Sequence, residues 1–229
     1  MINENTLRNQ ICAICNKMWS LGWGAANDGN VSVKLNDDRI LITPSGISKD
    51  SIAPEMIVTV NRAGVVLSGG KPSSEMKMHL RCYDERDDIG GVVHSHAPCA
   101  TAFAVANKPL DDYSMIEAVL TIGSVPVTDY ATPSTNQVGD SIAGFLKDHD
   151  VLLLGNHGAL SVGQDLSTAF NRMETLEHWA KVSINARILG GAVELPRDKI
   201  EELCSMREQY GIVGRHPGYK KYNKNMVLQ

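Results

Sequence analysis

Two histidines one residue apart, His94 and His96, end an apolar run, IGGVV, that predicts a buried strand. Residues i and i+2 of a strand point to the same side, so both imidazoles can be directed at one point. A catalytic zinc typically has three protein ligands and one open position. His157, in a turn between two apolar runs where Gly158 lets the backbone pass closely, is the candidate third ligand. On spacing alone, the alternative is a surface pair of histidines and an unrelated turn histidine.

Small polar residues gather in three further segments, GNVS, TPSG and PSSE, each at the end of a predicted strand or the start of a predicted helix. A helix N-terminus with exposed backbone N–H groups favours an anion, and a phosphate monoester is the anion that this pattern favours. Ser73 and Ser74 by themselves are better explained by ordinary helix capping, and the other two segments are what favour an anion site. The candidate anion-binding residues are Asn30, Ser45, Gly46, Ser73 and Ser74.

Glu75 follows these serines in the first turn of a predicted helix. An acidic residue there can simply complement the helix dipole. If its side chain instead faces a metal pocket, it is a carboxylate without a cation partner, which suits a general base for chemistry at carbon. His79 lies one turn later on the same face, and we expect it to support the site by hydrogen bonding rather than as a ligand.

The elements that position these residues follow from hydrophobic periodicity. Several predicted strands pair as hairpins, and strands and helices do not alternate as regular βα units. This favours an α/β fold with one mixed or mainly antiparallel sheet covered by helices. Helices are predicted over 5–22, 71–86, 98–107, 135–148 and 166–189, and strands over 29–35, 39–43, 56–61, 65–69, 89–94, 124–130 and the two halves of 150–163.

Composition restricts the class of protein. The 229 residues fit one large domain, and the net charge of −4 without a basic stretch argues against nucleic-acid binding. No apolar run approaches the ~18–20 residues of a membrane span, and the N-terminus lacks the pattern of a secretory signal. Five cysteines are an odd number for a disulfide framework. We therefore expect a cytoplasmic protein.

The segments GNVSVK, LITPSG, KPSSE, VVHSHAP and NHGAL, in this order and spacing, resemble the class II aldolase/adducin-head family. The resemblance extends from the first helix to about Tyr210. Within the family, the chain is most similar to L-fuculose-1-phosphate aldolase and related deoxyketose-1-phosphate aldolases. The resemblance implies one three-layer α/β/α domain over 1–229 with a mobile tail from about 211. It also implies a homotetramer with sites at subunit interfaces.

The same resemblance implies roles for the candidate residues. His94, His96 and His157 would bind a catalytic zinc, or another divalent metal such as Mn²⁺ or Co²⁺. Glu75 would be the acid/base carboxylate, and Tyr210 would close over the site. The phosphate of the substrate would be bound by Asn30, Ser45, Gly46, Ser73 and Ser74.

One position departs from the family pattern. Fuculose phosphate aldolases read His-Tyr-Met-Ile where this chain reads YSMI, so Ser114 stands in place of a tyrosine that the neighbouring subunit contributes as a proton donor. Tyr113, one position earlier, is the candidate substitute. This departure does not affect the residues that the resemblance assigns to the zinc and phosphate sites.

The implied function is zinc-dependent cleavage of a ketose 1-phosphate to dihydroxyacetone phosphate and an aldehyde. A sugar-phosphate 4-epimerase of the L-ribulose-5-phosphate type is the nearest alternative, although those enzymes carry Asp where this chain has Glu75. A dehydratase of methylthioribulose phosphate and a decarboxylase of oxo-tetronate phosphates share the fold. A non-catalytic adducin-head-like scaffold predicts loss of the histidines, which are present here.

Overall fold

The computed structural model describes residues 3–222, and within them seven strands form one sheet. The strand order is β4-β3-β2-β1-β5-β7-β6, and every neighbouring pair is antiparallel, as predicted. The strands are β1 Asn30–Lys34, β2 Arg39–Ile42, β3 Val58–Asn61, β4 Val66–Ser68, β5 Gly91–Ser95, β6 Val151–Leu154 and β7 Gly158–Gly163.

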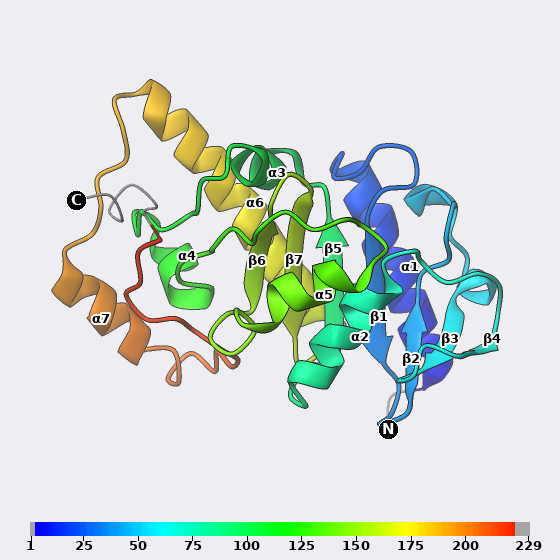
Figure 1. The fold of residues 1–229 in the computed structure, drawn as a ribbon. Coiled ribbons are helices and arrows are strands. Elements are labelled where there is room, and N and C mark those ends of the chain that lie inside the picture. The colour runs from blue at the N-terminus through cyan, green and yellow to red at the C-terminus, as the bar shows by residue number, and fades with distance from the viewer. Residues whose placement is uncertain (1–2, 223–229) are drawn as a thin grey trace.

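Helices cover both faces of the sheet, which confirms the three-layer α/β/α arrangement (Figure 1). Alternation along the strands supplies the two faces. In β2, Ile40 and Ile42 pack in the layer of α2 and α5, whereas Leu41 packs in the layer of α1, α3 and α6. The helices are α1 Glu4–Ser20, α2 Met76–Glu85, α3 Pro98–Val105, α4 Ile116–Thr121, α5 Asn136–Ala143, α6 Leu166–Ile188 and α7 Arg197–Ser205, with short 3-10 turns at Lys49–Ser51 and Pro54–Met56.

The helix expected from residue 71 begins later, at Met76. Residues 71–73 are held extended instead, because the Ser73 N–H donates to the Thr43 carbonyl and Pro72 forms a bridge with Pro44. This pairing fixes Ser73 and Ser74 beside the loop that follows β2. The chain turns into the helix only at Glu75, which occupies the N-cap position.

The segment predicted as an irregular strand at 124–130 forms isolated bridges only, Val125 with Leu110 and Val127 with Leu153. Pro126 lies between them and has no N–H to continue a ladder. The sequence did not predict α4 and α7, which form a small third cluster of buried side chains beyond β6 (Figure 1). No helix of the described residues is long and apolar enough to cross a bilayer.

The described part of the predicted tail lies against the domain. Arg172 donates to the Val213 carbonyl at 2.6 Å, and His216 donates to the Val119 carbonyl at 2.7 Å. Residues 223–229 of that predicted tail lie outside the described residues. The mobility of the tail stays a prediction.

Candidate active site

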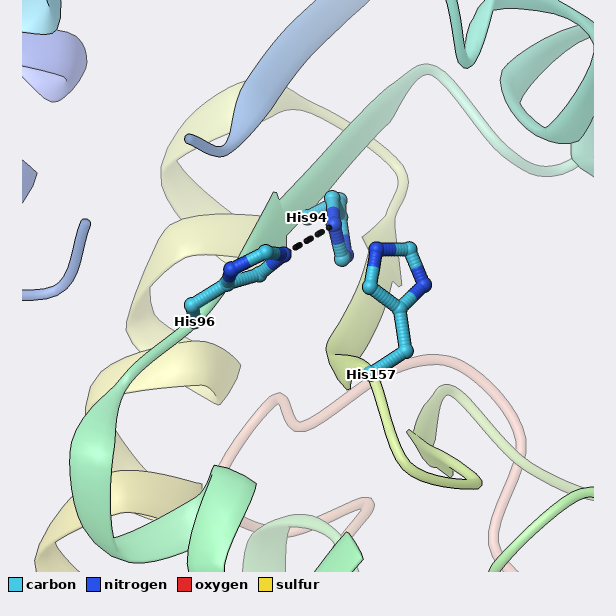
Figure 2. Close-up of side chains that lie close together, drawn as sticks. All are labelled: His94, His96 and His157. Carbon is cyan, nitrogen blue, oxygen red and sulfur yellow. Dashed lines mark hydrogen bonds between the residues drawn. The ribbon is translucent and has the colours of Figure 1, made fainter. Parts of the chain in front are cut away.

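Three histidines meet at one end of the sheet (Figure 2). His94 lies near the end of β5, His96 lies just beyond it, and His157 lies in the turn between β6 and β7. The pairing of β5 with β7 brings the turn next to the end of β5, with Ser95 opposite Ala159. The possible ligand atoms of all three residues lie within 4.8 Å of one another.

The ring orientations suit a cation between the histidines. The Nε2 atoms of His94 and His96 lie 3.2 Å apart (Figure 2). Nδ1 of His94 faces the Ala159 carbonyl at 2.9 Å, and Nδ1 of His96 faces Asp28 Oδ2 at 3.3 Å. An acceptor at each Nδ1 favours a ring proton there, which directs the Nε2 lone pairs toward each other. Oε2 of Glu75, 3.1 Å from Nε2 of His94, adds a negative charge at the same point. Facing lone pairs are stabilised by a positive ion between them, and this donor set therefore fits a divalent metal.

The pKa values agree with this charge preference. Burial by itself lowers the pKa of His94, but the Glu75 carboxylate outweighs burial and raises it. Burial, followed by the neighbouring His94, lowers the pKa of His96. The same two causes lower the pKa of His157 to about 4. The cluster thus attracts positive charge yet keeps His96 and His157 neutral, as metal ligands must be.

Glu75 is buried at the N-cap of α2 beside this cluster. Its Oε2 lies 3.1 Å from Nε2 of His94, and its Oε1 lies 3.4 Å from Nε2 of His157. Oε1 has no hydrogen-bond partner among the described residues. Burial opposes ionisation of Glu75, but His94 and His157 outweigh burial and lower its pKa. An ionised carboxylate with a free oxygen beside three imidazoles can bind a cation or move a proton.

A buried chain of hydrogen bonds fixes this carboxylate. Asn30, which pairs with His94 across β1 and β5, donates from Nδ2 to Glu75 Oε2 at 2.9 Å. Asn30 Oδ1 must then accept from Nε2 of His79, at 2.5 Å. Burial, the main cause, lowers the pKa of His79 to about 3, so the ring is neutral and its Nδ1 accepts from Ser32 Oγ at 2.7 Å. The Tyr83 hydroxyl completes the chain, 2.8 Å from Ser32 Oγ. His79 therefore has the supporting hydrogen bonds predicted for it.

A cavity of about 190 Å³ opens next to Glu75. It brings together His96, His157 and the small polar residues predicted from three separate segments. Gly46 has a φ of 75°, a left-handed conformation that favours glycine, in the loop after β2. The lining includes Asn30, Ser45, Gly46, Ser73, Ser74, Glu75, His96 and His157.

The predicted tyrosines do not lie at this cavity within the chain. Tyr113 is buried with α4 and α7, and its hydroxyl donates to the carbonyls of Gly218 and Lys220 at 2.8 and 2.9 Å. Ser114 donates to Asp112 Oδ1 at 2.8 Å. Tyr210 is 58% exposed, outside the cavity lining. Their catalytic roles stay predictions about an assembly of several chains.

Three further residues support the site, although the sequence does not predict them. Asp28 orients His96, and Lys49 lines the cavity. Glu177, in the middle of α6, accepts from the backbone N–H groups of Cys99 and Ala100 at 3.0 and 2.8 Å. It thereby caps α3, the helix that follows His96 directly. An acidic residue in the middle of a long helix carries no local signal of such a cap.

Comparison with known proteins agrees with this geometry. The chain is 33% identical over 206 residues to the 5-deoxy-D-ribulose 1-phosphate aldolase of Bacillus thuringiensis serovar kurstaki, covering 89% of this chain and 96% of the relative. It is 32% identical over 184 residues to the 3-oxo-tetronate 4-phosphate decarboxylase of Escherichia coli O6:H1, covering 78% and 86%. A solved L-fuculose 1-phosphate aldolase superposes with a TM-score of 0.82 at 32% identity, covering 89% of this chain and 96% of that one.

The family model described as the Class II Aldolase and Adducin N-terminal domain matches residues 9–184, most of the chain. That span contains the three histidines, Glu75 and the residues of the cavity lining. This chain belongs to the class II aldolase and adducin family.

Proposed function

We propose that this protein is a metal-dependent lyase that cleaves a ketose 1-phosphate to dihydroxyacetone phosphate and an aldehyde. The observation that carries the proposal is the position of Glu75. Its carboxylate contacts His94 and His157 and lines the same cavity as the small polar residues Asn30, Ser45, Gly46, Ser73 and Ser74. One small substrate could therefore contact the histidine cluster, the Glu75 carboxylate and the anion-binding residues of the cavity at the same time.

Two sets of residues would bind different parts of the substrate. Asn30, Ser45, Gly46, Ser73 and Ser74 would hold the phosphate, because they offer neutral donors and backbone N–H groups. A divalent metal such as Zn²⁺, Mn²⁺ or Co²⁺, held by the histidines, would supply Lewis-acid stabilisation of negative charge on substrate oxygens. The relatives named as sugar-phosphate aldolases support this substrate class.

Glu75 would move the proton. In the cleavage direction, its carboxylate accepts the proton of the C4 hydroxyl while the C3–C4 bond breaks. The electron pair of that bond passes to the dihydroxyacetone phosphate fragment as an enediolate. Glu75 then returns the proton to C3. This converts the enediolate to dihydroxyacetone phosphate, which leaves together with the aldehyde. In this route Glu75, rather than a tyrosine at position 114, accepts the hydroxyl proton.

A second candidate is decarboxylation of a 3-oxo-tetronate 4-phosphate, the reaction named for the relative from Escherichia coli O6:H1. The absence of a phenol at Ser114 favours it, because loss of CO₂ generates a comparable enolate without any aldehyde oxygen. Both reactions leave dihydroxyacetone phosphate, so the other product distinguishes them.

The test is to incubate the metal-loaded protein with deoxyketose 1-phosphates, ribulose 5-phosphate and a 3-oxo-tetronate 4-phosphate. Dihydroxyacetone phosphate with an aldehyde supports the proposal. CO₂ release supports the second candidate, and an epimerised pentose phosphate supports the epimerase alternative. A protein that carries no divalent metal and ignores chelators would contradict the site model.

We further propose a cytoplasmic homotetramer with sites at the subunit interfaces. The exposed Tyr210, and the exposed apolar Ile188 and Leu189 at the end of α6, support contacts with other copies. Light scattering of the purified protein tests the oligomeric state.

A further inference from the structure

Lys49 is a buried cation in the wall of the cavity. It lies in the 3-10 turn Lys49–Ser51, and only 4% of its surface is exposed. Its Nζ donates to the carbonyls of Asn27 and Ile47, at 2.8 and 3.1 Å. In the described part of the chain, no carboxylate lies within ion-pair distance of Nζ. The nearby Asp28 pairs with His96 instead.

This environment leaves Lys49 without a direct ion-pair partner among the described residues. An ammonium group has three donors, and two of them are occupied by backbone carbonyls. Burying a charge without a counter-ion is unfavourable, so buried lysines normally have a carboxylate partner or bind an anion. Burial indeed lowers the pKa of Lys49, although the Asp28 charge opposes this.

Lys49 lies beside the residues predicted to bind the substrate phosphate. It lines the same cavity as Ser45, Gly46, Ser73 and Ser74. Among the lining residues it is the one lysine, and no arginine is present. The serines and glycine can donate hydrogen bonds to a phosphate, but they carry no charge to balance it. Charge-assisted hydrogen bonds are stronger than neutral ones.

We propose that Lys49 binds the phosphate dianion of the substrate and makes this cavity selective for phosphomonoesters over unphosphorylated ketoses. This inference rests on the proposed function, because it assigns a further residue to the same substrate. Lys49 also joins the loop at Asn27 to the loop at Ile47, which carry Asn30 and Gly46. The ammonium group therefore orders the neutral donors as well as supplying charge.

Two variants separate charge from loop ordering. Lys49→Met removes both the charge and the hydrogen bonds, whereas Lys49→Gln removes the charge and keeps a donor. Lys71→Met is the matched control, because Lys71 is exposed on the neighbouring loop and lies outside the cavity lining. The metal content of each protein is measured first, since phosphate can also bind a metal.

The measurement is calorimetric titration of the metal-loaded proteins with inorganic phosphate. We expect the Kd to rise at least about tenfold in both Lys49 variants and to stay unchanged in Lys71→Met. In steady-state assays, the Lys49 variants should raise KM much more for the phosphorylated ketose than for the unphosphorylated ketose. A purely structural role would instead impair both substrates and lower the melting temperature in parallel.

The outcomes also separate this inference from the proposed function. If Lys49→Gln binds phosphate as tightly as the wild type, the assignment of Lys49 is wrong even if the enzyme cleaves ketose phosphates. The assignment is equally wrong if the wild type binds no phosphate. If phosphate binding depends on Lys49 but no ketose phosphate is cleaved, the proposed reaction fails and the anion site stands.

Discussion

Oε2 of Glu75 lies 3.1 Å from Nε2 of His94, at the meeting point of a helix N-terminus and a strand end. The carboxylate belongs to the N-cap of α2 and the imidazole to β5. Their contact combines a proton carrier with a candidate metal ligand.

Replacing Glu75 by Gln keeps the side-chain volume and removes the proton-accepting carboxylate. We expect kcat to fall at least about 100-fold, because general acid–base catalysis contributes about that much or more. The metal should stay bound, since the three histidines remain. Assays of ketose phosphate cleavage, with metal analysis of the same samples, test this. Glu117→Gln, an exposed glutamate on α4, is the control, and an active Glu75→Gln protein would overturn the acid/base assignment.

Ser32→Ala removes the hydroxyl that donates to Nδ1 of His79. The ring is then free to protonate Nδ1, so Nε2 no longer donates to Asn30 and the orientation of Glu75 is lost. We expect kcat to fall roughly tenfold with little change in KM, as for other outer-shell partners. Ser20→Ala, which removes an exposed hydroxyl at the end of α1, is the control. An unchanged kcat would show that the hydrogen-bond chain does not position Glu75.

Gly158→Ala tests the close approach of β7 to the histidines. An added Cβ would lie 2.7 Å from the Ser95 carbonyl oxygen and 2.8 Å from Cδ2 of His96. We expect a loss of about 1–3 kcal/mol in the free energy of unfolding, together with weaker metal binding. Denaturant unfolding and metal titration measure the two effects. Gly144→Ala is the control, because its Cβ would have no neighbour within 4 Å, and equal effects in both variants would contradict the packing argument.

His216 should make the stability of the C-terminal segment depend on pH. Its Nε2 donates to the Val119 carbonyl, and its Nδ1 accepts from the Gly218 N–H at 3.1 Å, so the ring is neutral. Burial, as the main cause, lowers its pKa from 6.5 to about 4. Between these values the unfolded chain binds a proton that the folded chain does not. The stabilising contribution is therefore complete above pH 6.5 and is lost as the pH falls toward 4, by up to about 1.4 kcal/mol per pH unit.

Urea unfolding at pH 7.5 and pH 5 checks this dependence. The His216→Gln protein should lose less stability between the two pH values than the wild type, because it no longer has this titrating group. His178→Gln, at an exposed position of α6, should keep the wild-type difference. Identical pH profiles for all three proteins would exclude a contribution from His216.

Local patterns in the sequence determined much of this protein. The alternation of apolar residues predicted the hairpins β1–β2 and β3–β4, and the spacing of His94 and His96 predicted that both face one point. These features depend on neighbouring residues, so they can be read from a short stretch of chain. The family resemblance extended this reading to the remote residues of the site.

The tertiary structure alone decided how the distant segments meet. The pairing of β1 with β5 places Asn30 opposite His94, and the bridge of Pro72 with Pro44 delays α2 so that Glu75 becomes its N-cap. The burial of Lys49 and the capping of α3 by Glu177 have no local signal either. Such contacts join residues far apart in the chain, and their register is set by packing and burial rather than by local propensity. The side chains that hold the catalytic groups in place can therefore be identified only from the tertiary structure.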